Sequence, residues 1–259
     1  MSAPVASRAF RGAVGTVGEF YALTLDTVAA LRRRPFQWAE FLDQCWATIR
    51  VALLPTIVMS IPFTVLVVFT LNSLLGEIGA SDLSGAGAGL GTITQIGPLV
   101  TVLVVAGAAA TAITADLGSR SIREEIDAME VLGIDPVHRL VVPRVLAATV
   151  VATLLNGAVC AIGLVGGFFF SVYLQDVNPG AYVQGLTLLV GLPELLLSQA
   201  KAAVFGAVAG LIACYRGLSV TGGPKSVGQA VNETVVFAFI ALFLVNMLLT
   251  SIGLALAAA

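Results

Sequence analysis

Five stretches of this sequence are apolar for long enough to cross the hydrocarbon core of a lipid bilayer. A spanning helix needs about 20 predominantly apolar residues, because the core is about 30 Å thick. The stretches run from Val51 to Leu75, Gln95 to Leu117, Val141 to Tyr173, Leu192 to Tyr215 and Val227 to Leu256. With 58% hydrophobic and only 11% charged residues, the chain lacks the polar groups that a water-soluble surface needs. We therefore predict an all-α integral membrane protein with five transmembrane helices.

The first 50 residues, ahead of these spans, have a different pattern. Residues 1–15 are expected to form a short tail. Apolar residues then recur at helical spacing over residues 17–31, and the run RRRP at residues 32–35 ends that segment. A second amphipathic stretch carries Trp38 and Trp46, and aromatic rings beside arginines are typical of the headgroup layer. We predict interfacial amphipathic helices, with a cytosolic hairpin packed on the same protein as the alternative.

The positive charges predict the orientation in the membrane. Of the thirteen Lys and Arg residues, Lys201 alone lies outside the first 50 residues and the segments 119–144 and 216–225. The connections 76–94 and 174–191 contain none. Because basic loops stay on the cytoplasmic side, we predict a cytoplasmic N-terminus and an extracytoplasmic C-terminus in the plasma (inner) membrane.

A charged insert between the second and third spans carries the most information. Ser121 and Glu124 have capping-box spacing, which predicts that a helix begins there. Gly133 and Pro136 predict its end, because Gly tolerates the left-handed cap and Pro cannot continue the helix. The predicted helix covers about residues 122–132. One face is apolar and is made by Ile122, Ile126, Met129 and Leu132. The segment is either a solvated loop helix or a helix that presents acids to another protein.

The run EEIDAMEVLGIDPVHRLVVPR, with GPLVTVLVVAG before it, resembles the signature of the MlaE/YrbE permease family. Members of this family are membrane subunits of ABC transporters that work with MCE proteins. The resemblance covers roughly Gln37 to Leu254 and is strongest to the actinobacterial YrbE branch, with an A-type subunit expected. The broader family has an arginine where this chain has Ala108, so that arginine's role does not carry over.

The resemblance implies a function. Residues 51–259 would form the permease domain, and the 122–132 helix would be the coupling helix that docks on a cytoplasmic ABC ATPase. The residues that match the family's motif there are Glu124, Glu125, Asp127, Met129, Gly133, Pro136 and Arg144. The implied partners are a second YrbE-type permease, forming a heterodimer, and extracytoplasmic MCE proteins. The implied substrates are hydrophobic membrane lipids of the fatty acid, mycolic acid or sterol class, moved by import.

Two further patterns lie inside the spans. Lys201 and Glu194 are seven residues apart on one face of the fourth span, and a charge inside a membrane is a functional candidate. They either line the substrate path, or Lys201 only snorkels or pairs structurally. Gly206 and Gly210 form a GxxxG motif, which indicates close helix packing. Packing within the chain is the preferred interpretation of such small residues, and a subunit interface is the alternative, including for Gly107 in the second span.

No pattern indicates catalysis. The segment GLSVTGGPKS does not fit the phosphate-loop motif, and the single histidine, His138, has no Cys or His cluster around it that predicts a metal site. Together with the family resemblance, this leads us to expect a transporter subunit rather than an enzyme, with no cofactor of its own and no nucleic-acid partner. ATP and Mg²⁺ would be bound by the separate ATPase. The rival interpretation is a non-transporting membrane scaffold that recruits a cytoplasmic partner through the acidic helix.

Overall fold

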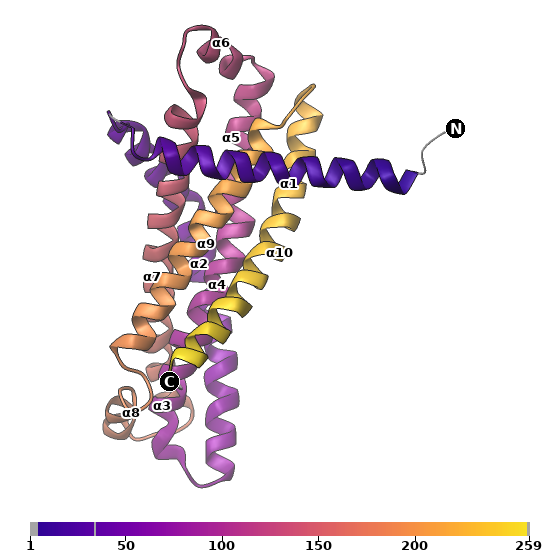
Figure 1. The fold of residues 1–259 in the computed structure, drawn as a ribbon. Helices are drawn as coiled ribbons and strands as arrows, with labels where there is room; N and C mark the ends of the chain where they lie inside the picture. Colours follow the sequence, from indigo (N-terminus) through magenta and orange to yellow (C-terminus); the bar gives the residue numbers. More distant parts are fainter. Residues whose placement is uncertain (1–4, 34, 258–259) are drawn as a thin grey trace.

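The computed structural model describes residues 5–33 and 35–257, and every regular element in these two ranges is helical. One helix lies across a bundle of long helices (Figure 1). The α-helices in chain order are α1 (Val5–Ala30), α2 (Trp38–Glu77), α3 (Ser84–Gly91), α4 (Gly97–Val104), α5 (Ala110–Ile122), α6 (Glu125–Val131), α7 (Val142–Leu174), α8 (Pro179–Gly185), α9 (Leu192–Leu218) and α10 (Pro224–Ala257). We refer to the two ends of the bundle as the α6 end and the α8 end.

Five helical segments of the described residues are long and apolar enough to cross a membrane, which confirms the predicted fold class. They are Trp38–Glu77, Ser84–Ile122, Val137–Leu174, Leu192–Leu218 and Pro224–Gly253. Two of them are continued by π-helical turns at Thr92–Ile96, Val105–Ala109 and Val137–Val141.

Helix α1 lies crosswise to the bundle near the α6 end (Figure 1). It already begins at Val5, so the tail predicted for residues 1–15 is wrong from that residue onward, and residues 1–4 lie outside the described part. Its inner face is fixed to α9 by Tyr215, which packs edge-to-face on Phe20 and donates a hydrogen bond to Glu19 at 3.0 Å. The opposite face leaves Val17 and Tyr21 exposed. A crosswise helix with an exposed apolar face has the form of an interfacial helix.

The predicted second amphipathic segment and the first span form one helix, the 40-residue α2. Pro55 and Pro62 lie inside it without ending it. A helix of this length is about 60 Å long, twice the thickness of the hydrocarbon core, so its ends extend beyond that core.

The second span begins at Ser84 and not at Gln95, because most of the predicted outer connection is helical. Its glycines provide close packing rather than flexibility. A Cβ atom on Gly85 would lie 2.0 Å from the carbonyl oxygen of Tyr182 in α8. The same holds for α7, which runs unbroken through Gly163, where a Cβ would lie 2.5 Å from the Thr92 side chain. Helix α7 is therefore continuous through its glycines.

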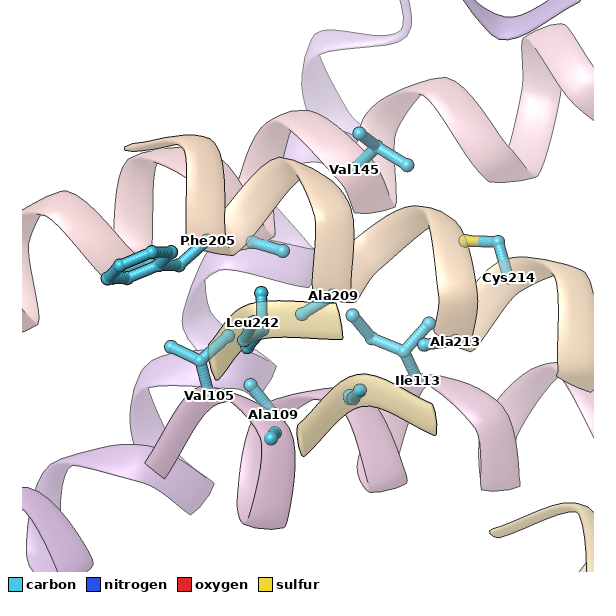
Figure 2. Close-up of a cluster of buried hydrophobic side chains, with 14 of the residues drawn as sticks. Val105, Ala109, Ile113, Val145, Phe205, Ala209, Ala213, Cys214 and Leu242 are labelled. Atoms are coloured by element: carbon cyan, nitrogen blue, oxygen red, sulfur yellow. The ribbon is translucent and has the colours of Figure 1, made fainter. Parts of the chain in front are cut away.

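The main core lies where the second, third, fourth and fifth spans meet. Figure 2 shows its labelled members, which are Val105, Ala109, Ile113, Val145, Phe205, Ala209, Ala213, Cys214 and Leu242. The GxxxG motif of α9 faces α7 in this region, since a Cβ on Gly206 would lie 2.4 Å from the carbonyl oxygen of Ala148. This confirms that the motif packs helices within the chain. Gly107 differs, because it is exposed and its Cβ would have no atom within 4 Å.

Candidate functional site

Helix α6 projects beyond the long helices at one end of the bundle (Figure 1). The predicted start of this helix is wrong. Helix α5 continues through Ser121 to Ile122, and the Ser121 hydroxyl donates to the carbonyl oxygen of Val220 instead of capping. The chain then bends at Glu124, which has a left-handed conformation with φ 59° and makes no side-chain cap. Helix α6 therefore starts at Glu125 and is seven residues long.

The C-terminal end of α6 is formed by Gly133, as the sequence predicts. Gly133 has φ +75°, and its N–H bonds to the carbonyl of Glu130 at 2.9 Å. The N–H of Ile134 bonds to the carbonyl of Met129, also at 2.9 Å. These two bonds form a Schellman motif, which requires a residue that tolerates positive φ at the Gly133 position. The helix is thus short and is capped at its C-terminal end.

The two faces of α6 differ in how deeply their side chains are buried. Ile126 and Met129 pack against the main core, as their spacing predicts. Leu132 does not join them: it lies past the last helical residue and is 75% exposed. Val131 is 87% exposed beside it. Asp127 is also exposed, so the free surface of α6 combines a carboxylate with two large apolar side chains.

A chain of ion pairs connects α6 to the membrane helices. Glu125 lies 3.1 Å from Arg123 and 3.9 Å from Arg120. Arg120 in turn pairs with Asp116 at 3.2 Å, the i,i+4 ion pair that sequence spacing alone indicates. Because Arg120 belongs to α5 and Arg123 lies in the bend between α5 and α6, Glu125 is engaged within the chain.

The ion-pair chain continues to Arg144, which is fully buried in α7. Its guanidinium lies 2.5 Å from Asp116 of α5 and 3.3 Å from Glu40 of α2, and it donates to the carbonyl oxygen of Leu140 at 3.0 Å. A buried charge of this kind is costly unless it is paired, so the three elements are held together by it. Sequence analysis placed Arg144 in the motif but did not find Glu40, which is more than 100 residues away.

The segment after α6 is fastened to the corner between α1 and α2. Asp135 accepts a hydrogen bond from Arg33 at 2.6 Å, and Arg139 donates to Gln37 at 2.6 Å. Pro136 precedes the π-helical turn that leads into α7. The loop that carries α6 is therefore held on both sides, by the ion pairs of Asp116 and by this corner.

The two candidate substrate-path residues are not paired with each other. Lys201 is only 4% exposed, and its Nζ donates to Thr250 Oγ1 of α10 at 2.9 Å. The Glu194 carboxylate instead accepts the N–H of Gly191 at the start of α9, at 2.8 Å. Thr250 was not identified from the sequence, because its partner lies 49 residues away on another helix.

A second polar contact joins α4, α7 and α9. The Asn156 side chain of α7 donates to Ser198 of α9 at 3.0 Å and accepts from Thr101 of α4 at 3.3 Å. Such bonds join helices in lipid, where an unpaired polar group is costly.

Comparison with known protein families matches residues 41–252 to the family described as Permease MlaE. A probable ABC transporter permease of Synechocystis is 32% identical over 172 residues, which are 66% of this chain and 65% of that protein. The permease MlaE of an intermembrane phospholipid transport system in Haemophilus influenzae is 29% identical over 73% of this chain and 70% of its own length. The chloroplastic protein TRIGALACTOSYLDIACYLGLYCEROL 1 of Arabidopsis thaliana is 26% identical over 87% of this chain and 65% of that protein.

The chain spans slightly less than two thirds of the Synechocystis relative, whereas it covers 92% of a probable ABC transporter permease of Rickettsia conorii. The family match runs from the first turns of α2 into α10 and so includes the segment with α6 and Arg144. This five-span membrane protein belongs to the MlaE permease family.

Proposed function

We propose that the chain is the membrane subunit of an ABC transporter that moves hydrophobic lipids, with ATP hydrolysed by a separate subunit. The observation that carries this proposal is α6. It is a short helix at one end of the bundle, it exposes Asp127, Val131 and Leu132, and it is joined by ion pairs to three of the membrane-spanning segments. A stiff contact of this form suits the transmission of movement from an ATPase to the spans.

The proposed orientation puts α6 on the cytoplasmic side. The arginines of the α6 end support it, since positive-inside sorting favours basic groups near cytoplasmic helix ends. In this orientation the N-terminus is cytoplasmic, the C-terminus is extracytoplasmic and α1 lies in the inner headgroup layer.

The proposed coupling site comprises the acids and the turn residues of the α6 segment. Asp127 and Glu124 are exposed and can meet basic or N–H donor groups of the ATPase. Glu125 and Arg144 act within the chain, because both are held by intramolecular ion pairs. Gly133 and Pro136 fix the path of the chain around the helix.

The proposed assembly contains a second, different permease of the same family, together with extracytoplasmic MCE proteins. Gly107 supports the permease contact: it is an exposed glycine in the otherwise well-buried second span. A small residue there lets another helix approach closely. The proposed substrates are fatty acids, mycolic acids or sterols, moved inward; the name of the Haemophilus influenzae relative adds phospholipid to these classes.

The test is purification of the tagged chain from its native membrane, followed by assay of ATP hydrolysis with and without added lipid. The proposal predicts a co-purifying ATPase whose turnover changes with lipid. A preparation that contains a cytoplasmic partner but no lipid-responsive ATPase would support the membrane scaffold instead.

A further inference from the structure

The corner between α1 and α2 borders an open hollow of about 430 Å³. Its lining is of three kinds: two guanidinium groups, two aromatic rings and two aliphatic side chains. The residues are Arg32, Arg33, Phe36, Trp38, Leu31 and, from α7, Leu146. None of these residues belongs to the ion-pair chain that runs from α6 to Glu40.

The hollow lies where the bundle meets the crosswise helix. Leu146 is in the second turn of α7, at the α6 end, and the corner joins α1 to α2 at the same level (Figure 1). Trp38 is 66% exposed, and its ring packs edge-to-face on Phe36, with ring centroids 4.8 Å apart. Indole rings in such a position favour the layer between lipid headgroups and acyl chains.

The charges around the hollow leave a positive excess. Arg33 is matched by Asp135 at 2.6 Å, and the nearby Glu40 is engaged by Arg144 and Gln44. Arg32 has no ion pair with any residue in the described ranges. No acidic side chain is among the lining residues. The site therefore combines an unmatched guanidinium with apolar walls.

We propose that this hollow binds an anionic phospholipid of the adjoining leaflet. Arg32 holds the headgroup phosphate, Arg33 adds positive potential, and the upper part of an acyl chain lies against Leu31 and Leu146. A free inorganic anion would use the guanidinium but would leave the aromatic and aliphatic walls uncovered. Because Arg33 and Gln37 also fasten the segment after α6, a lipid bound here stabilises the corner that supports α6. Lys201 is not among the residues that line this site.

The chain offers a direct probe, because Trp38 and Trp46 are its two tryptophans. In a Trp46→Phe background, Trp38 reports on lipids in the hollow. The full-length chain is reconstituted in phosphatidylcholine vesicles that contain a minor fraction of either brominated phosphatidylglycerol or brominated phosphatidylcholine. Trp38 fluorescence is then compared between the two. Arg32→Gln is the test variant, and Arg50→Gln, an exposed arginine of α2 outside the hollow, is the matched control.

We expect brominated phosphatidylglycerol to quench Trp38 more strongly than brominated phosphatidylcholine. Arg32→Gln should reduce the local preference for the anionic lipid about fivefold, because a basic group at an anionic surface contributes an interaction of about that size. Arg50→Gln should keep the preference, and Arg32→Lys should restore most of it. Equal quenching by the two lipids would overturn the proposal, as would a preference that survives Arg32→Gln or is lost equally in Arg50→Gln. Loss of the preference on adding inorganic phosphate would also overturn it, by showing a site for a free anion.

Discussion

The guanidinium of Arg144, fully buried in α7, donates a hydrogen bond from Nη2 to the carboxylate of Asp116 in α5 at 2.5 Å. Asp116 precedes α6 in the chain and Arg144 follows it, so this ion pair closes the base of the loop that carries α6. Arg120 and Glu125 extend the connection to α6 itself. A displacement of α6 must therefore act on both membrane helices that flank it.

Removal of one partner of this ion pair should destabilise the protein. Arg144→Met removes the cation that Asp116 and Glu40 share, and we expect a loss on the order of 1–3 kcal/mol, because both carboxylates are partly exposed and Asp116 keeps Arg120. The double variant Arg144→Met/Asp116→Leu should recover part of this loss. The free energies of unfolding of Arg144→Met, of Asp116→Leu and of the double variant in detergent micelles test the prediction. If each single variant loses less than about 1 kcal/mol, the pair behaves like an exposed one.

Two glycines should respond in opposite ways to the same change. Gly206→Ala places a Cβ against the backbone of Ala148, so we expect a loss of about 1–3 kcal/mol from overpacking. Gly107→Ala meets no atom within 4 Å and should be neutral, or stabilising by up to about 1 kcal/mol through helix propensity. Thermal unfolding of the purified chain distinguishes them. Equal losses in both variants would contradict the assignment of the GxxxG motif to packing within the chain.

Lys201 should matter for transport more than for folding. Lys201→Met replaces a buried amine that contacts Thr250 with an apolar side chain of similar length, a change that is often neutral for stability. If Lys201 lines the lipid path, lipid transport in reconstituted vesicles should fall while the complex still assembles. Thr250→Val is the control for the loss of the hydrogen bond alone. Unchanged transport in Lys201→Met would leave the lysine with a structural role.

The orientation predicts which ends of the bundle a reagent can reach. Single cysteines at Asp82 and at Glu130, in a background without Cys45, Cys160 and Cys214, occupy exposed positions near opposite ends. A membrane-impermeant maleimide should label the Asp82→Cys variant in intact cells. The Glu130→Cys variant should react only after the membrane is opened. Labelling of the Glu130→Cys variant in intact cells would show that the protein has the opposite orientation in the membrane.

The number of spans and the end of α6 could be predicted from sequence, because both rest on local patterns. Hydrophobic length alone defines a spanning helix, and Gly133 satisfies a backbone requirement that few residues meet. Proline and glycine are weak guides to helix breaks in this chain. Pro55 lies inside a continuous α2, and Gly85 and Gly163 serve close helix contacts.

The ion pairs could not be predicted from sequence, because they join distant parts of the chain. Asp116 and Arg120 are one helical turn apart, so their spacing indicates the pair, whereas Glu40 meets Arg144 only after α2 and α7 pack. The prediction of a capping box at Ser121 and Glu124 was wrong for a related reason. Ser121 found a partner in Val220, on a loop that folds back beside α5, so its hydroxyl did not start a helix. Tertiary contacts decided both outcomes.

The measurement that tests the coupling proposal most directly is a charge reversal at Asp127. This side chain is exposed on α6 and makes no ion pair with other described residues, so Asp127→Lys should leave folding and insertion intact. Glu77→Lys, an exposed change at the α8 end, is the matched control. We predict that Asp127→Lys lowers the affinity for the ATPase by on the order of 2–5 kcal/mol. It should lower lipid transport in parallel, while Glu77→Lys changes neither. Normal co-purification of the ATPase together with normal lipid transport in Asp127→Lys would show that α6 is only a solvated loop helix.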